Sequence, residues 1–128
     1  MLDPGLESRL SACDAAELGP HAAALLAELQ RAVRAGMPLS AVLLAATLVD
    51  VVAHEEAGPA GLVDGIDFAY AGNKAALGWL RGRRNELLHH ERPTDGLMGE
   101  SVAADWHWRD AGKAVTALLD YLEDLSGY

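Results

Sequence analysis

The stretch W-L-R-G-R-R-N-E-L-L-H-H-E-R-P, residues Trp79 to Pro93, combines a leucine-rich helical pattern with a concentration of arginine. Of the ten lysines and arginines in the chain, four lie in this window: Arg81, Arg83, Arg84 and Arg92. Glu86 and Glu91 reduce the charge of the window to +2 (4 − 2), whereas the whole chain carries −9 and the remainder therefore −11. A cationic segment on an acidic protein indicates a site for an anionic group rather than an extended nucleic-acid surface.

The leucine spacing predicts an α-helix that buries one face. At 100° per residue, a sector of about one third of the circumference contains Leu77, Leu80, Arg84, Leu87, Leu88 and Glu91. Arg84 lies near the middle of this sector, and an uncompensated buried charge is strongly destabilising. We therefore expect Arg84 to have an acidic partner, or to face an interface or a cleft.

A second row on the same helix consists of Gly78, Gly82, Asn85 and His89. Two glycines inside a helix cost about 1 kcal/mol each relative to alanine. Close approach of another backbone would compensate for that cost, and this backbone belongs either to a neighbouring helix or to a second copy of the chain.

The candidate partner of Arg84 lies in the most apolar part of the sequence. The segment 38–56 is predicted to be a central helix that is apolar nearly all round, and Asp50 is its exception. A lone carboxylate in such a helix requires a cation, so we hypothesise an Asp50–Arg84 contact. A purely structural pair and a pair that supports a functional site are equally compatible with the pattern.

The chain of 128 residues is predicted to form one all-α domain, 1–128, an antiparallel bundle of four main helices plus short extra helices. Aromatic and β-branched residues are scarce, which favours helix over sheet. The expected main helices span residues 21–35, 38–56, 73–91 and about 103–125, with Gly36 capping the first, Asn73 capping the third and Pro93 following it. The expected minor elements are a short, frayed helix within 2–18, a short helix or irregular turn at 62–71, and a flexible loop at 94–100.

Cysteine content and the N-terminus indicate the compartment. The single cysteine, Cys13, forms no internal disulfide and fits a reducing cytoplasm. The opening M-L-D-P-G-L-E lacks the basic region and apolar run of a secretion signal. The most apolar run, Met37 to Val49, is shorter than the roughly 20 residues that cross a membrane. We therefore expect a soluble, cytoplasmic protein that does not enter a membrane.

Arg84, Asn85 and His89 form the pattern R-N-x-x-x-H. This pattern resembles the motif of the HEPN superfamily of small helical domains, in which four to six residues separate an Arg from a His and Asn commonly follows the Arg. In helix order and length the resemblance covers roughly residues 20–125. Arg83 with His89, and either arginine with His90, also satisfy the spacing, but Asn85 favours Arg84 with His89. One branch of the family has a Tyr two residues after the His, where this chain has Glu91.

Many HEPN proteins are metal-independent RNA endonucleases of toxin–antitoxin, abortive-infection and CRISPR-associated systems, and they act as dimers. The resemblance implies that Arg84 and His89 are catalytic, that Asn85 assists them, and that an antitoxin or another defence protein is a partner. Asp50 would support Arg84. The neighbouring residues expected to bind RNA are Arg81, Arg83, His90 and Arg92. No metal and no cofactor is expected.

The motif suits cleavage of RNA by its own 2′-hydroxyl group. Histidine transfers protons near neutral pH, and the planar guanidinium of arginine matches phosphate oxygens. On an ideal helix Arg84 and His89 project about 140° apart, so one motif does not easily enclose a phosphate. Two copies across a twofold axis would bring the two side chains together from different chains, which predicts a homodimer.

Two other interpretations compete with this one. The first is a catalytically silent HEPN-like helical module for dimerisation or for binding nucleic acid or a protein partner; the acidity of the chain favours it, because lysine and arginine contacts dominate affinity for nucleic acid. The second is an unrelated bundle in which the motif is coincidental.

Among the tryptophans, Trp106 is a candidate for base stacking, Trp79 for an oligomer interface, and Trp108 for the core.

Overall fold

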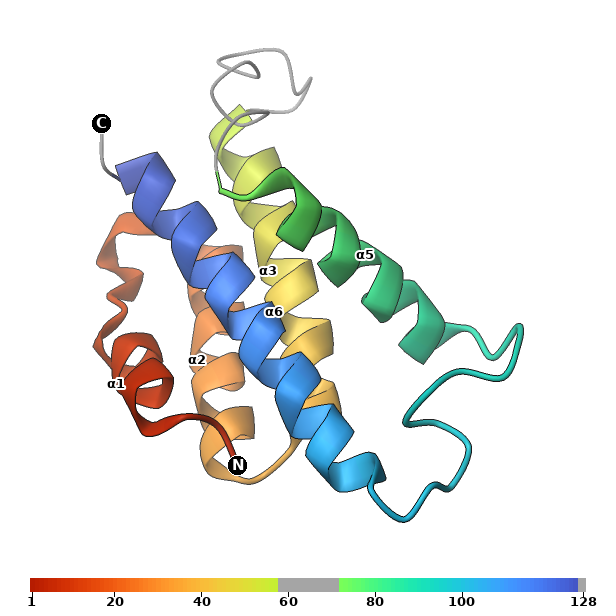
Figure 1. Ribbon diagram of the computed structural model, residues 1–128. Helices are drawn as coiled ribbons and strands as arrows, with labels where there is room; N and C mark the ends of the chain where they lie inside the picture. Colours follow the sequence, from red (N-terminus) through yellow and green to blue (C-terminus); the bar gives the residue numbers. More distant parts are fainter. Residues whose placement is uncertain (58–71, 127–128) are drawn as a thin grey trace.

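The computed structural model describes residues 1–57 and 72–126, and every regular element within these ranges is helical (Figure 1). The four long helices are α2 (Pro20–Arg34), α3 (Pro38–Ala57), α5 (Lys74–Leu88) and α6 (Ala103–Ser126); α1 (Pro4–Ala12) and the 3₁₀ turn η1 (Ala15–Glu17) precede them. Successive long helices run in opposite directions in Figure 1. The predicted all-helical bundle is confirmed, whereas the element expected at 62–71 lies outside the described residues.

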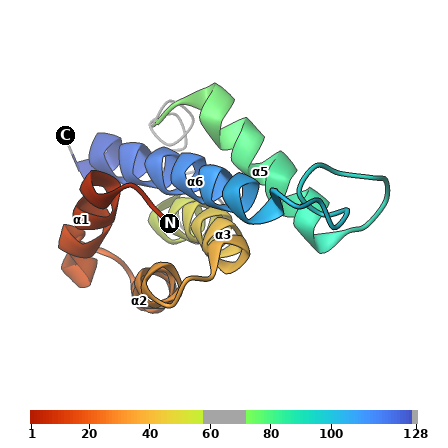
Figure 2. The same ribbon diagram turned by 60° about the horizontal axis from the view of Figure 1, so that its bottom comes forward.

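Helix α3 forms the centre of the bundle. It contacts α2, α5 and α6, and Figure 2 shows it between α2 and the pair formed by α5 and α6. Its side chains with less than 4% exposure are Ala41, Val42, Ala45, Ala46, Leu48, Val49 and Val52. Burial on several sides explains why α3 is apolar nearly all round.

Helix α3 is also the one helix, among the described residues, with the length and hydropathy of a membrane-spanning segment. The window that meets both criteria, Pro38–Glu55, is longer than the apolar run noted in the sequence. In the structure three other helices pack against it. Of the residues in this window, 39% are buried inside the bundle.

A tight turn connects α2 to α3. Gly36 has a φ of 77°, a left-handed conformation that favours glycine. The Gly36 N–H donates to the Val33 carbonyl at 3.2 Å, and the Met37 N–H donates to the Ala32 carbonyl at 2.9 Å. These two bonds form the motif that commonly ends helices, and Pro38 then begins α3. The predicted helix end at Gly36 is confirmed.

The N-terminal segment packs on the bundle instead of fraying. The Asp3 carboxylate accepts the Leu6 N–H at 3.1 Å and caps α1, and Leu10 is 1% exposed. Arg9 pairs with Asp120 at 3.3 Å and with Glu123 at 2.7 Å, both on α6. The hydrogen bond to Glu123 is the largest cause that raises the pKa of the Arg9 guanidinium. Hydrophobic burial and ion pairing together dock α1 against α6.

Helix α5 begins as predicted and ends earlier. The Asn73 side chain accepts the Ala76 N–H at 3.0 Å, which confirms the N-cap. The helix ends at Leu88 rather than near residue 91, because His89 adopts an extended conformation with φ −131° and ψ 115°. Histidine has only moderate helix propensity, and residues 89–91 are exposed, so no packing extends the helix further.

The buried face of α5 also differs from the predicted sector. Leu80 is 1% exposed as expected, but Leu88 is 58% exposed. Arg83 is the buried arginine, with a side chain 7% exposed, whereas the Arg84 side chain is 22% exposed. Because α5 packs against both α3 and α6, its buried sector extends toward α6, on the side where Arg83 lies.

The segment after α5, expected to be a flexible loop at 94–100, is held in place by hydrogen bonds. The Arg83 Nη2 donates to the Asp95 carbonyl at 2.9 Å, and the His107 Nε2 lies 2.5 Å from the Gly96 carbonyl oxygen. Gly96 has a φ of 86°, and a Cβ at this position would lie 3.3 Å from both Arg83 and His107. A side chain there would be strained and crowded, so glycine permits the close approach of the loop to α5 and α6.

Candidate functional site

Arg84 and Asp50 form the ion pair that the sequence predicted. The Arg84 Nη1 donates to the Asp50 Oδ2, and the Arg81 Nε lies 3.6 Å from the Asp50 Oδ1. One carboxylate on α3 thus holds two arginines from α5. The Asp50 side chain is 34% exposed, so the group lies at the edge of the interior. Two guanidinium groups on one carboxylate leave this flank of α5 positively charged.

Arg83 makes a second, separate set of contacts. Its Nε donates to the Asp110 Oδ2 on α6 at 2.8 Å, its Nη2 donates to the Asp95 carbonyl, and its Nη1 lies 3.9 Å from the Glu86 Oε2. With a side chain 7% exposed, Arg83 has little contact with solvent. Contact with an RNA phosphate would require these bonds to break, so in this structure Arg83 links α5, α6 and the following loop rather than forming a surface contact.

The other two residues of the motif are open to solvent. Asn85 and His89 are exposed, as is His90, and within residues 1–57 and 72–126 their side chains have no hydrogen bond or ion pair. The backbone N–H of His89 donates to the Asn85 carbonyl at 2.9 Å and closes the last turn of α5. Because His89 has left the helix, the ideal helical angle between Arg84 and His89 does not apply. No contact joins their side chains among the described interactions.

The glycines of α5 face outward. Gly78 and Gly82 are exposed, and a Cβ built on either would meet nothing within 4 Å. The first explanation for these glycines, close packing against a neighbouring helix, is therefore excluded for the described part of the chain. Within residues 1–57 and 72–126, no atom approaches these two glycines closely enough to require the absence of a side chain.

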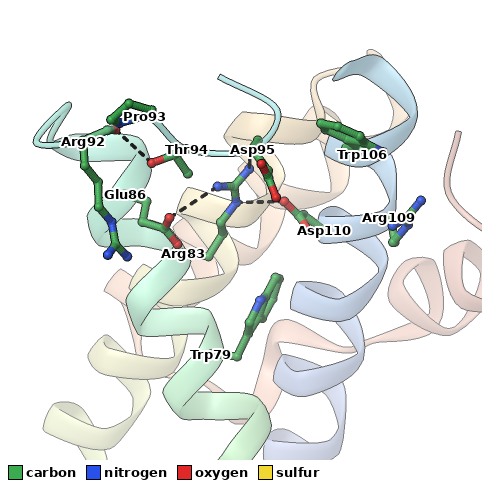
Figure 3. A pocket seen from close by; sticks show the side chains of 10 residues that line it. All are labelled: Trp79, Arg83, Glu86, Arg92, Pro93, Thr94, Asp95, Trp106, Arg109 and Asp110. Atoms are coloured by element: carbon green, nitrogen blue, oxygen red, sulfur yellow. Dashed lines mark hydrogen bonds and ion pairs between the residues drawn. The ribbon is translucent and has the colours of Figure 1, made fainter. Parts of the chain in front are cut away.

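A pocket of about 570 Å³ opens on the other flank of α5 (Figure 3). Trp79 on α5 and Trp106 on α6 both line it, and the Arg83–Asp110 pair lies between them in this view. Arg92 and Arg109 stand on opposite sides of the pocket in Figure 3. The structure thus brings together two tryptophans, for which the sequence predicted separate roles, and two predicted RNA-binding residues, Arg83 and Arg92.

The described residues contain no cluster of metal-ligating side chains, and the one cysteine, Cys13, has a raised pKa. Within the described ranges, no three His, Cys, Asp or Glu side chains gather in a way that would hold a metal ion. Burial is the main cause that raises the pKa of the Cys13 thiol, and the nearby charges of Asp14 and Glu123 add to it. A raised pKa keeps the thiol protonated near neutral pH, where a nucleophile would need the thiolate.

Comparison with known proteins gives no match to a family model, a curated protein or a solved structure. The residues and their geometry therefore carry the functional assignment.

The sequence pattern did not identify Asp110 and Arg109 as members of a site. The available signal was the position of Asp110 beside Ala111, on the border of the apolar stripe of α6, where an acidic residue needs a cation opposite.

We predict that Asp110→Asn lowers the free energy of unfolding more than Asp50→Asn does. Breaking a buried ion pair costs about 3–5 kcal/mol, and the remaining partners of Arg83 reduce this to about 2–3 kcal/mol. Asp50 and Arg84 are more exposed, so Asp50→Asn costs about 1 kcal/mol. Urea unfolding of the two variants measures both values. Equal losses would contradict the assignment of Arg83 as the buried arginine.

Proposed function

We propose that this chain is a HEPN-like, metal-independent RNA endonuclease that acts as a cytoplasmic homodimer in a toxin–antitoxin or other defence system. Arg84 and His89 are its catalytic residues and Asn85 assists them. Arg81, His90 and Arg92 provide further contacts to RNA. The observation that carries the proposal is the Asp50–Arg84 ion pair, together with the open surface beside it.

The ion pair supports a catalytic arginine because it fixes the side chain without burying it. Asp50 accepts from one terminal nitrogen of Arg84, and 22% of the Arg84 side chain stays exposed. A guanidinium held in this way keeps other donors for a phosphate and loses less conformational entropy when it binds. Arg81, 54% exposed beside the same carboxylate, adds positive charge where the RNA backbone would lie.

The chemistry requires a proton carrier and a stabiliser of charge. In RNA cleavage, the oxygen of the 2′-hydroxyl attacks the adjacent phosphorus, its proton passes to a base, and the 5′-oxygen leaves with a proton from an acid. The products are a 2′,3′-cyclic phosphate and a 5′-hydroxyl. His89, exposed at the end of α5, is the proton carrier, and Arg84 stabilises the negative charge on the phosphoryl oxygens.

A dimer completes this site. Within one chain no described contact joins Arg84 to His89. The exposed glycines at positions 78 and 82 leave room for the backbone of a second α5. A twofold axis near the C-terminal end of α5, between Arg84 and His89, would bring the His89 of one copy toward the Arg84 of the other, which supplies the composite site that the motif implies.

A specific observation favours a second candidate, the catalytically silent helical module. Three of the four arginines between Trp79 and Pro93, namely Arg81, Arg83 and Arg84, have an acidic partner within the chain. These pairs reduce the cationic potential that RNA binding needs on a protein with a net charge of −9. In this alternative the same α5 surface mediates dimerisation or binds a protein partner.

The nuclease proposal predicts that the purified protein cleaves RNA in excess EDTA and leaves 2′,3′-cyclic phosphate ends. His89→Ala is expected to reduce the rate at least about 100-fold, because it removes the proton carrier. Since His89 is exposed and its ring makes no described contact, thermal stability should not change. Gel analysis of a labelled RNA, with identification of the product ends, measures the rate.

His21→Ala is the matched control, because His21 is also an exposed histidine but lies on α2. It should cleave at the wild-type rate. Undiminished cleavage by His89→Ala would refute the catalytic assignment. Absence of cleavage by the wild-type protein, combined with a dimer in solution, would favour the silent module.

The dimer proposal predicts that Gly82→Leu weakens self-association without unfolding the chain. A single chain has space for the added side chain, because nothing lies within 4 Å of a Cβ at this position, whereas a second α5 packed there would be displaced. Light scattering during size-exclusion chromatography measures the mass. Ala24→Leu, at an exposed position on α2, is the control and should leave the dimer intact. A wild-type monomer at concentrations where RNA is cleaved would contradict this account.

A further inference from the structure

The pocket between α5, α6 and the intervening loop has a fixed floor. The Arg83–Asp110 ion pair, 2.8 Å between Nε and Oδ2, joins the two helices beneath it. The Arg83 Nη2 also holds the Asp95 carbonyl of the loop at 2.9 Å. An ion pair with this little exposure fixes the spacing of the pocket walls. The pocket therefore has an ion pair between two helices as part of its wall.

The two tryptophans that line the pocket, Trp79 and Trp106, differ in their packing against the core. Trp79 packs against the core with part of its ring, and the Lys113 ammonium lies 4.1 Å from the ring centroid. Trp106 is partly exposed, and it does not belong to the described side chains that pack against the core. A large indole at the edge of a pocket, without core contacts, has a surface available for a planar ligand.

Two arginines at the rim of the pocket have no described acidic partner. Five of the eight arginines in the sequence have a described acidic partner: Arg9, Arg31, Arg81, Arg83 and Arg84. Arg34, Arg92 and Arg109 have none among the described residues, and the last two flank this pocket. An unpaired guanidinium on an acidic protein is a ready site for phosphate.

From this combination we propose that the pocket binds a nucleotide, with the base stacked on Trp106 and the phosphate held by Arg92 or Arg109. The volume of about 570 Å³ lies in the range of small-molecule sites, about 300–1,000 Å³. The stacking surface accepts any base, because every base has a π face. The nucleotide is either a free mononucleotide or one unit of an RNA chain, and both present the same chemistry.

This site is distinct from the proposed catalytic residues. Arg84 faces α3, where it pairs with Asp50, whereas Arg83 and the pocket face α6. The inference therefore does not depend on RNA cleavage. A silent module would bind the nucleotide equally well, and a nuclease would use the pocket to hold a nucleotide away from the scissile phosphate.

Tryptophan fluorescence tests the proposal directly. Trp108 packs against the core, so Trp108→Phe in the full chain removes background emission and leaves the two pocket indoles. Titration with adenosine monophosphate and with a six-residue 2′-O-methyl oligoadenylate, which cannot be cleaved by attack of a 2′-hydroxyl, should each quench the emission in a saturable way. Quenching by the mononucleotide identifies a free nucleotide as sufficient, and quenching by the oligonucleotide alone identifies RNA as the source. No quenching by either at millimolar concentration would overturn the proposal.

Variants separate base from phosphate recognition. In the intact chain, Trp106→Ala should weaken the affinity of the bound probe, measured by calorimetry, roughly 5- to 150-fold, which is the range for loss of one stacked base. Arg92→Gln with Arg109→Gln should weaken it at least about tenfold and reduce its dependence on salt. Ribose 5-phosphate, which lacks a base, should bind more weakly than adenosine monophosphate.

Two controls keep the test specific. Arg34→Gln changes an exposed, unpaired arginine on α2 and should not alter binding. His21→Ala, at an exposed histidine on α2, should not alter it either. Thermal unfolding of each variant verifies the fold. Unchanged affinity in a folded Trp106→Ala protein, or ribose 5-phosphate bound as tightly as the nucleotide, would overturn the proposal.

Discussion

Two adjacent arginines fix the position of α5 between two different helices. Arg84 pairs with Asp50 on α3, and Arg83 pairs with Asp110 on α6. Consecutive residues on a helix project about 100° apart, so neighbouring side chains reach opposite flanks. Each partly buried carboxylate requires its cation, and each cation requires its carboxylate. The rotation of α5 about its own axis is therefore set by charge as well as by Leu77 and Leu80, and the exposure of Arg84 and the shape of the pocket beside α6 both depend on that rotation.

Helix α5 therefore carries a candidate site on its α3 side and another on its α6 side. On the α3 side it leaves Arg84 partly exposed beside Asn85 and near the end of the helix at His89. On the α6 side it sets the floor of the pocket between Trp79 and Trp106. The same ion pairs also limit how much free positive charge the protein can offer. An acidic chain with most arginines already paired would recognise a phosphate at a few defined points rather than through a broad field.

Much of the fold followed from patterns that depend on local chemistry. Glycine after α2 and asparagine before α5 each act within one or two helical turns. The Asp50–Arg84 pair was predictable because Asp50 is the only charge in the interior of an apolar helix, so few partners could satisfy it.

The remaining features could not be derived from one-dimensional spacing. Arg83 is buried instead of Arg84 because α5 packs on two helices at once, and the sequence does not show the angle of that packing. His89 lies outside the helix because nothing covers residues 89–91, which is a tertiary effect. The loop at 94–100 is held through Arg83, His107 and Gly96, contacts that join residues distant in sequence. The pocket arises from these same contacts.

A double-mutant cycle measures the coupling on which this account depends. The free energies of unfolding of wild type, Arg83→Gln, Asp110→Asn and the double variant give the interaction energy of the pair that sets the rotation of α5. Direct contact inside the protein predicts a coupling of about 1–3 kcal/mol, with the double variant more stable than the sum of the single losses implies. Strictly additive losses would mean that Arg83 and Asp110 do not interact, and would contradict the proposed positioning of α5 and of the sites on its two flanks.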